Sequence, residues 1–304
     1  MSVGLGIFCS TSDNKLSTNH TVKLNNLSVE TVLKSFERNL ADLHKLLKLS
    51  VDMGFTIFRL GSSFIPFASH PRFQEEWLKP IEQQLKRHAP TLKAYGVRIT
   101  MHPGQYVVLN SPKREVVERS LAELKYHFWI LDTLELDSES VVVVHVGGTY
   151  GDKKRAMEKF ADTVEENKWL RKRLAVENDE RHFNAEEVVE LAEETQLPAV
   201  FDYYHHKLNQ SNFNVDRLLA TWRKTTPETH LSSPPPNPRK TGEHGDYVNI
   251  EDFEELIKIF DTETRIDVII EAKKKEKAAA KLITEINTSK PHLAKILIKP
   301  KPII

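Results

Sequence analysis

Eight short apolar runs with the composition of β-strands alternate along the chain with eight longer segments of helical periodicity. The strand-like runs are residues 3–8, 55–61, 98–104, 141–148, 174–179, 199–206, 229–233 and 267–273. Apolar residues recur three and four positions apart in the segments 29–53, 72–95, 113–136, 152–171, 184–195, 213–223, 250–261 and 275–287. Strands and helices that alternate eight times are typical of a single (β/α)8 barrel, which we therefore predict.

The apolar runs themselves favour a parallel sheet covered on both faces. VVVV at 141–144 and DVII at 267–270 lack the alternation of apolar and polar residues that a half-exposed strand shows. A doubly wound open sheet is the main alternative, because it also alternates strands with helices. Such a sheet collects its ligands at one switch point, whereas metal-binding residue types here follow nearly every strand.

Seven of the eight strand-like runs end in, or lead into, a residue that can bind a metal. The strands of a barrel present their carboxyl ends at one face, so these residues predict one site there. Their mixture of imidazoles and carboxylates suits zinc or manganese better than magnesium or calcium. The set is too large for one tetrahedral ion and indicates two or three ions that share carboxylates. The candidate ligands are His70, His102, His145, Glu177, Asp202, His205, His230, His244 and Glu271.

A single histidine at the end of a strand is often an ordinary core residue, and chance explains one or two such placements. Chance explains the whole set poorly. The sharpest local signal is Asp202-x-x-His205, which can direct a carboxylate and an imidazole at one cation. In MHPGQY at 101–106, the turn at Pro103-Gly104 is expected to present Gln105 and Tyr106 outward, where they could wedge into a base stack. Ordinary loop packing is the alternative for these two residues.

Composition and charge add little that is specific to one function. The chain has 304 residues, 39% of them hydrophobic, and one cysteine, Cys9, so it forms no intramolecular disulfide and fits a reducing compartment. We see neither a secretory signal nor an apolar run long enough to span a membrane, and expect a cytoplasmic protein. The net charge is zero, but residues 273–304 hold nine lysines against Glu276 and Glu285. These lysines could help to dock an anionic polymer, or they could belong to a solvated helix and tail.

Several longer motifs are more specific than these patterns. They are FRLGSSFIPFASHP at 58–71, MHPGQYVVLNSP at 101–112, VVERSLAELKYH at 116–127, HVGGTYGDK at 145–153, VENDER at 176–181, DYYHHKLN at 202–209 and IEAKKKE at 270–276. In these stretches the chain resembles the ultraviolet damage endonucleases, which are related to endonuclease IV-type and xylose isomerase-like barrels. The resemblance implies a (β/α)8 barrel with up to three divalent cations, typically manganese. It also implies a nick immediately 5′ of cyclobutane dimers and 6-4 products, which leaves a 3′-hydroxyl and a 5′-phosphate.

The resemblance also assigns roles to residues. It makes the nine candidates above the metal ligands, and it makes Gln105 and Tyr106 the probes of the undamaged strand. Some family members carry a lysine, reported to become carboxylated, where this chain has Glu228. We expect Glu177, as a bridging carboxylate, Glu228 and Lys153 to take part in catalysis. We expect Lys153, Lys154, Arg239 and Lys240 to contact the DNA backbone.

The expected organisation is a catalytic barrel over residues 1–276, followed by the end of a helix and a lysine-rich tail at 277–304. The expected substrate is double-stranded DNA that carries ultraviolet photoproducts. We expect a prokaryotic enzyme that is associated with the nucleoid. We expect a monomer without a membrane association or an obligate protein partner. A metal-dependent sugar isomerase or epimerase on the same barrel, and a protein that binds damaged DNA without cutting it, are the alternatives.

Overall fold

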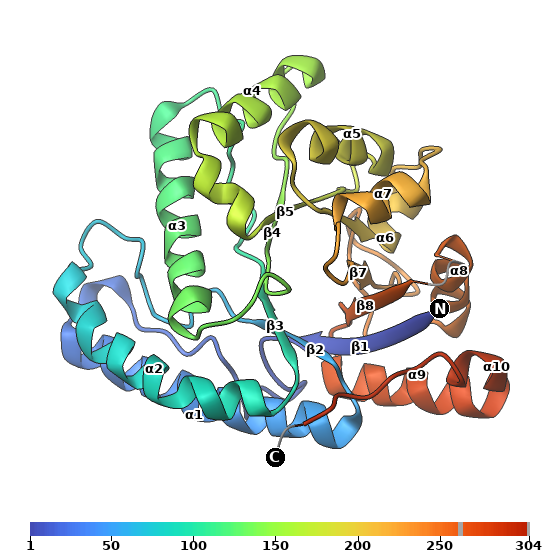
Figure 1. Ribbon diagram of the computed structural model, residues 1–304, viewed down its shortest axis with the longest axis horizontal. Coiled ribbons are helices and arrows are strands. Elements are labelled where there is room, and N and C mark those ends of the chain that lie inside the picture. Colours follow the sequence, from blue (N-terminus) through green and yellow to red (C-terminus); the bar gives the residue numbers. More distant parts are fainter. Residues whose placement is uncertain (261–263, 303–304) are drawn as a thin grey trace.

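A computed structural model describes residues 1–260 and 264–302 and contains a closed barrel of eight parallel strands (Figure 1). Each strand pairs with the next one in the sequence, and the last pairs with the first. The predicted barrel is confirmed, and the closed sheet rules out the doubly wound alternative. The strands are β1 (Ser2–Phe8), β2 (Ile57–Leu60), β3 (Arg98–Met101), β4 (Val142–His145), β5 (Leu174–Glu177), β6 (Ala199–Asp202), β7 (Glu228–Leu231) and β8 (Arg265–Ile270).

The predicted helices lie around the barrel, with ends that differ by a few residues from the predicted ones (Figure 1). The segment at 72–95 begins with a 3-10 turn and becomes α-helical only at Leu78, and predicted helix position 261 lies outside the described residues. The α-helices are α1 (Val29–Met53), α2 (Leu78–Ala94), α3 (Arg114–Thr133), α4 (Lys153–Glu166), α5 (Ala185–Thr195), α6 (Tyr203–Leu208), α7 (Val215–Thr221), α8 (Ile250–Ile259), α9 (Lys275–Ser289) and α10 (Pro291–Ala294). The 3-10 helices are η1 (Leu24–Asn26), η2 (Glu75–Trp77) and η3 (Lys168–Lys172).

The short helix α6 was missed, because the residues after Asp202 were expected to form only a turn at the end of the strand. The strand ends at Asp202, whose Oδ1 accepts a hydrogen bond from the backbone N–H of His205 at 2.7 Å. A side-chain acceptor at this position satisfies an otherwise unpaired donor of the first helical turn. The cap therefore overrides the strand propensity of Tyr203 and Tyr204, and it turns His205 back towards the end of β6.

Alternation along each strand separates the barrel interior from the outer core. Val143, Ala175 and Val200 lie two residues before the last residues of β4, β5 and β6, so they share a face with His145, Glu177 and Asp202. They form a small buried cluster with Val141 and Trp222, whereas the intervening residues belong to the large core between sheet and helices. On the side of β4, β5 and β6, the barrel interior thus has apolar side chains beneath the polar residues at the strand ends.

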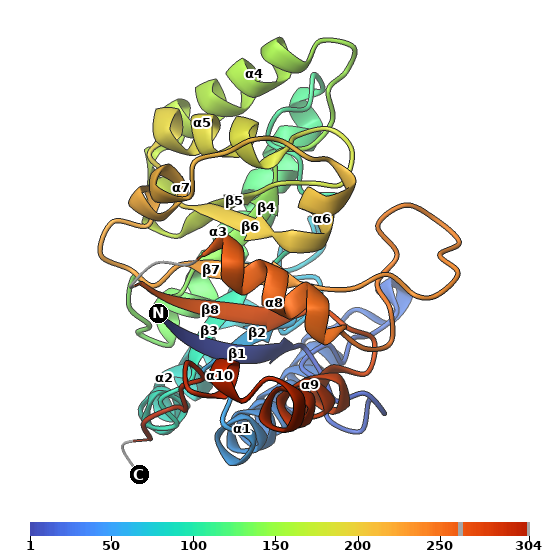
Figure 2. The ribbon, with the colours of Figure 1, turned by 90° about the vertical axis from the view of Figure 1, so that its right-hand side faces the viewer.

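The C-terminal segment lies at the end of the barrel where the strands begin. After α10 the chain runs beside β1, where Val3 N donates to Ile296 O at 2.8 Å and Ile298 N donates to Val3 O at 2.9 Å. The side chain of Lys299 lies over Gly54, which precedes β2. Figure 2 shows both termini on the side away from the strand arrowheads. The last lysines of the tail are therefore remote from the strand ends that carry the histidines. None of the helices in the described ranges is long and apolar enough to cross a membrane.

Candidate metal centre

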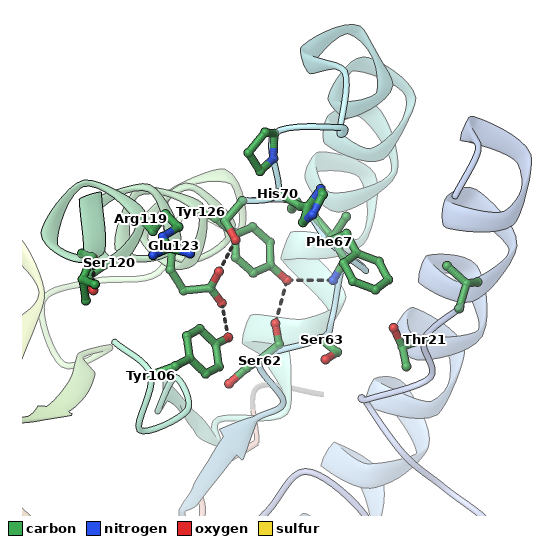
Figure 3. Close-up of a pocket in the computed structure, with 16 residues that line it drawn as sticks. Thr21, Ser62, Ser63, Phe67, His70, Tyr106, Arg119, Ser120, Glu123 and Tyr126 are labelled. Atoms are coloured by element: carbon green, nitrogen blue, oxygen red, sulfur yellow. Dashed lines mark hydrogen bonds between the residues drawn. The ribbon is translucent and has the colours of Figure 1, made fainter. Parts of the chain in front are cut away.

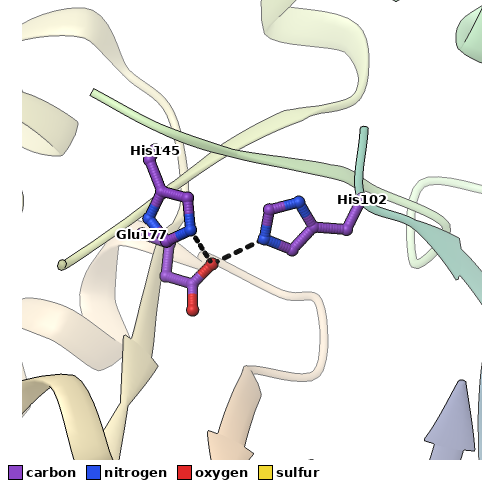
Figure 4. Close-up of side chains that lie close together, drawn as sticks. All are labelled: His102, His145 and Glu177. Atoms are coloured by element: carbon purple, nitrogen blue, oxygen red, sulfur yellow. Dashed lines mark hydrogen bonds and ion pairs between the residues drawn. The ribbon is translucent and has the colours of Figure 1, made fainter. Parts of the chain in front are cut away.

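Glu177, the last residue of β5, lies at the centre of the polar cluster and is almost fully buried. Its Oε2 lies 2.9 Å from His102 Nε2 and 3.6 Å from His145 Nε2 (Figure 4). Its Oε1 lies 2.7 Å from His230 Nδ1 and 3.8 Å from His205 Nδ1. One carboxylate therefore faces four imidazoles that come from the ends of four other strands.

Two groups of three residues have the geometry to hold a cation, and Glu177 belongs to both. The first group is His102, His145 and Glu177, and the second is Glu177, Asp202 and His205; the donor atoms within each group lie within 4.8 Å of one another. Nδ1 of His145 and Oδ2 of Asp202 are buried without a hydrogen-bond partner among the described residues. Buried polar atoms are normally paired. The unpaired oxygen of Asp202, together with the imidazole and carboxylate atoms grouped around Glu177, fits the chemistry of a shared cation site.

A second arm of the cluster is formed around Glu271, which follows β8. His230 Nδ1 lies 3.6 Å from Glu271 Oε1, and His244 Nδ1 lies 3.7 Å from Glu271 Oε2. The guanidinium of Arg59 in β2 donates to Glu271 and also contacts His230 Nε2. His244 comes from the long loop 232–249 and stands at the edge of the cluster, with its ring 6.4 Å from that of His205.

The cluster has opposite effects on the pKa values of its histidines. Burial lowers the pKa of the His145 imidazole to about 4, so this side chain is neutral and able to bind a metal near pH 7. Burial also disfavours the charged form of His205, but the carboxylates of Asp202 and Glu177 outweigh it and raise the pKa to about 9. In the same way, Glu177 raises the pKa of buried His230 to about 10. A cation that binds here must displace protons from these two imidazoles, so metal binding releases protons.

Glu228 lies deeper in the barrel than the two donor groups and is fully buried. Its Oε1 lies 3.1 Å from His230 Nε2 and 3.3 Å from the hydroxyl of Thr100. Oε2 lies 3.7 Å from the guanidinium of Arg98. Although burial opposes ionisation, the bond to His230 and the charge of Arg98 lower the pKa of Glu228. Among its described contacts, the Glu228 carboxylate therefore binds the His230 imidazole from the interior side of the barrel.

Two candidates from the sequence lie outside these groups in the described part of the chain. His70 Nδ1 accepts the N–H of Arg72 at 3.1 Å, and its ring packs against Phe67. It lines a cavity of about 650 Å³ beside Tyr106 (Figure 3). Lys153, at the start of α4, places its ammonium 2.9 Å from Glu187 Oε1. Both residues lie at the end of the barrel where the strands finish.

The residues expected to meet DNA are exposed at the same end. Gln105 is exposed and Tyr106 is 65% exposed, so the predicted outward presentation of this pair is confirmed. Lys154, Arg239 and Lys240 are exposed as well. The loop 232–249 carries the last two, and Figure 2 shows it in orange, projecting beyond the arrowheads of the strands.

Three residues with clear roles in the cluster were missed. Arg59 interrupts the apolar run FTIFRLG, and a charge inside a buried strand was the available signal. Asn178 Nδ2 donates to Asp202 O at 3.0 Å, and its Oδ1 accepts from Asp202 N at 2.8 Å. Asp179 accepts bonds from the backbone N–H groups of residues 181–183. The last two belong to the motif VENDER, in which only the first glutamate was given a role.

Comparison with known proteins agrees with the motifs. Residues 10–296 match the UV-endonuclease UvdE family. The UV DNA damage endonuclease of Clostridium perfringens (strain 13 / Type A) is 31% identical over 291 residues, which cover 93% of this chain and 70% of that protein. The protein of the same name from Bacillus velezensis is 30% identical over 267 residues, with coverage of 85% and 83%.

Comparison with solved structures agrees with the fold. The crystal structure of SacUVDE superposes with a TM-score of 0.85 at 31% identity, over 94% of this chain and 98% of that one. D-psicose 3-epimerase from Clostridium cellulolyticum H10 has a TM-score of 0.52 at 11% identity, over 97% and 95% of the two chains, which shows a shared fold alone. By its sequence match and its similarity to these relatives, the chain belongs to the UV-endonuclease UvdE family.

Proposed function

We propose that this protein is a metal-dependent DNA-repair endonuclease that cuts DNA at ultraviolet photoproducts. The observation that carries the proposal is the pair of donor groups that share Glu177, with an unpaired buried oxygen on Asp202. Family membership supports the substrate, because the curated relatives are named UV DNA damage endonucleases. The proposed lesions are cyclobutane dimers and 6-4 products, with hydrolysis immediately 5′ of the lesion to leave a 3′-hydroxyl and a 5′-phosphate.

We propose two or three manganese ions, with zinc or magnesium as alternatives, held by the Glu177-centred groups and by the Glu271 arm. Bound cations would supply a nucleophile from water at neutral pH and neutralise charge on the scissile phosphate. The protein's own contribution is to fix the donors. Asn178 orients Asp202 through two hydrogen bonds, Glu228 supports His230, and Arg59 balances the charge of Glu271. Such supporting residues set the orientation and basicity of ligands.

Selectivity for damage would come from the exposed loop after β3. Damaged dinucleotides stack and pair poorly, so their extrusion costs less than that of normal nucleotides. Gln105 and Tyr106 are exposed there and would fill the gap that an extruded lesion leaves. Lys153, Lys154, Arg239 and Lys240 would contact the phosphates of double-stranded DNA, which the protein would engage as a monomer.

A nicking assay tests the proposal. Purified protein is incubated with supercoiled plasmid, irradiated or not, in manganese or in a chelator, and Glu177→Gln serves as the inactive control. We expect nicks in the irradiated plasmid alone, none with the chelator, and none with the variant. Ligation of the nick without prior end treatment checks for a 3′-hydroxyl and a 5′-phosphate. If the wild-type protein binds metal and leaves irradiated plasmid intact, the proposed function is wrong.

A further inference from the structure

A buried carboxylate on α3 holds two of the loops at the mouth of the barrel. Glu123 is 6% exposed. Its Oε1 accepts the hydroxyl of Tyr106 at 2.9 Å, and its Oε2 accepts the hydroxyl of Ser69 (Figure 3). Tyr106 belongs to the loop after β3, and Ser69 belongs to the loop after β2 that carries His70. One side chain therefore joins the loop with the exposed tyrosine to the loop with a candidate ligand.

Glu123 forms no ion pair with a lysine or arginine in the described ranges, although Arg119, one helical turn earlier on α3, lines the same cavity. The one imidazole of the described ranges within ion-pair distance of its carboxylate is that of His127, whose Nδ1 is 3.8 Å away. Burial lowers the pKa of His127, so its imidazole is neutral near pH 7. A buried carboxylate without a cation is costly, and two hydroxyl donors offset only part of that cost. This placement is therefore poorly explained by stability.

Neighbouring residues on the same face of α3 fasten the same two loops. Tyr126 donates its hydroxyl to Ser62 O at 3.1 Å and accepts the N–H of Ile65 at 2.7 Å, in the loop after β2. Ser120 accepts the N–H of Val108 at 2.8 Å, in the loop after β3. These bonds reach only the backbone. Glu123 differs, because it holds the side chain of Tyr106 itself.

Tyr106 is held at both ends of its ring. A Cβ atom placed on Gly104 would come within 2.6 Å of the ring, so the ring lies directly over this glycine. The hydroxyl is anchored on Glu123, yet the residue is 65% exposed. A large aromatic surface is thus presented to solvent in one fixed rotamer. Immobilising a side chain before binding removes an entropic cost from the association.

We propose that Glu123 is a positioning residue that fixes Tyr106, ties it to the loop of His70, and thereby sets the discrimination between damaged and undamaged DNA. The inference rests on the proposed function. Glu123 touches neither DNA nor metal in this role, because it acts through the hydroxyl of Tyr106.

The test compares nicking rates on irradiated and unirradiated plasmid for four variants. Glu123→Ala should lower the ratio of the two rates about tenfold, the value of a lost hydrogen bond to a charged group. Glu123→Gln keeps an acceptor for Tyr106 and a donor for Ser69, so its ratio should fall by less than about threefold. Tyr106→Phe should match Glu123→Ala. Glu118→Gln is the control, since Glu118 lies on the same helix, is exposed, and pairs with Arg114.

A double variant separates positioning from a general structural effect. If Glu123 acts through the tyrosine hydroxyl, Tyr106→Phe/Glu123→Ala should have the same ratio as Tyr106→Phe alone. Effects that add would overturn the proposal. It would also be overturned if Glu123→Ala slowed both reactions equally or lost bound metal. Should Glu123→Ala fail to fold, Glu123→Leu with and without Tyr106→Phe serves the same comparison.

A spectroscopic measurement keeps this proposal separable from the proposed function. With 3-fluorotyrosine at position 106, the ¹⁹F spectrum of the free protein should show one narrow line. Glu123→Ala should shift or broaden that line, whereas Glu118→Gln should leave it unchanged. If the wild-type protein cuts no irradiated DNA, this spectrum still tests the positioning role. An identical line in Glu123→Ala would overturn it.

Discussion

The two ends of the barrel both bury charged residues, but they treat those charges differently. Where the strands begin, each buried charge has several partners within the protein. Where the strands end, carboxylates and imidazoles gather around Glu177, and some of their atoms have no hydrogen-bond partner among the described residues. Both ends come from the same eight strands. The difference therefore follows from the residues at each end: paired charges at one end, and candidate metal ligands at the other.

At the end where the strands begin, the buried charged side chains are paired within the protein. Arg173, just before β5, donates to Asp132 at 2.7 Å and to the backbone carbonyls of Leu136, Asp137 and Ser140. Asp267 in β8 accepts the hydroxyl of Thr56 at 3.0 Å and the guanidiniums of Arg265 and Arg98 at 3.0 and 3.3 Å. Buried charges are tolerated when most of their hydrogen-bonding capacity is filled in this way, although Nη2 of Arg98 has no hydrogen-bond partner among the described residues.

The end where the strands finish balances its charge with the Arg59 guanidinium and with protons held by its histidines. Buried Glu177 keeps a pKa well below the ordinary value because His230 and His145 face it, against the effect of burial. Asp202 is the opposite case, since burial raises its pKa and its Oδ2 has no hydrogen-bond partner among the described residues. Bound cations would therefore stabilise these carboxylates and imidazoles more than their contacts with one another do. The comparison thus predicts that substitutions at this end change activity, and that substitutions at the other end change stability.

Glu177→Gln should have the largest effect on activity, because it removes the one carboxylate that both donor groups share. Loss of metal stabilisation worth several kcal/mol corresponds to a fall in nicking rate of about a thousandfold or more. The free energy of unfolding without metal should fall as well, because His205 and His230 lose the carboxylate that raises their pKa values. Nicking rates, metal content by mass spectrometry and urea unfolding would measure these three quantities. A variant that retained its metals and nicked normally would contradict the central role of Glu177.

Asp267→Asn should show the reverse behaviour. The substitution leaves buried Arg98 without one of its carboxylates, and breaking a buried ion pair costs about 3–5 kcal/mol. Because Arg98 keeps Glu228 and two backbone carbonyls, we expect the lower part of that range. Urea unfolding would measure the loss, while metal content and nicking rate per folded molecule should match the wild type. A variant of normal stability with reduced nicking would contradict the prediction that substitutions at this end affect stability and not activity.

Asn178→Ala should have an intermediate effect on the metal-binding end. The side chain of Asn178 makes two hydrogen bonds to the backbone of Asp202, and the backbone carbonyl of Asn178 lies 3.0 Å from His205 Nδ1. Removing a residue that orients ligands typically lowers metal affinity by about 10–100-fold. Titration of the metal-free protein with manganese would measure the affinity. Asn209→Ala is a matched control, because its amide donates to Asp179 O outside the donor groups. Equal affinities for both variants would argue against this role.

The sequence predicted the barrel and most of its metal-binding end, for a physical reason. Strand ends converge on one face of a barrel, so residues such as His145 and Glu177 could be placed together without knowledge of any contact. The role of Asn178 could not be predicted, because it depends on hydrogen bonds between neighbouring strands. The layer occupied by Glu228 follows from its spacing to His230, yet its contacts with Arg98 and Thr100 join distant segments. Helix α6 was missed because the cap at Asp202 continues the expected turn into a helix.

The smallest effect concerns surface charge, and it tests whether the two ends also differ towards DNA. Arg239→Gln/Lys240→Gln removes two exposed charges from the loop 232–249, at the end of the candidate metal centre. Removing one cationic side chain that binds a phosphate should reduce the salt slope of DNA binding by about 1, so the pair should reduce it by about 2. Lys299→Gln/Lys301→Gln removes the same charge from the tail at the opposite end. Fluorescence anisotropy with irradiated duplex at several salt concentrations should give an unchanged slope for the tail variant. Both double variants change the net charge by the same amount. If the tail variant reduced the slope as much as the loop variant does, DNA would contact the tail as well.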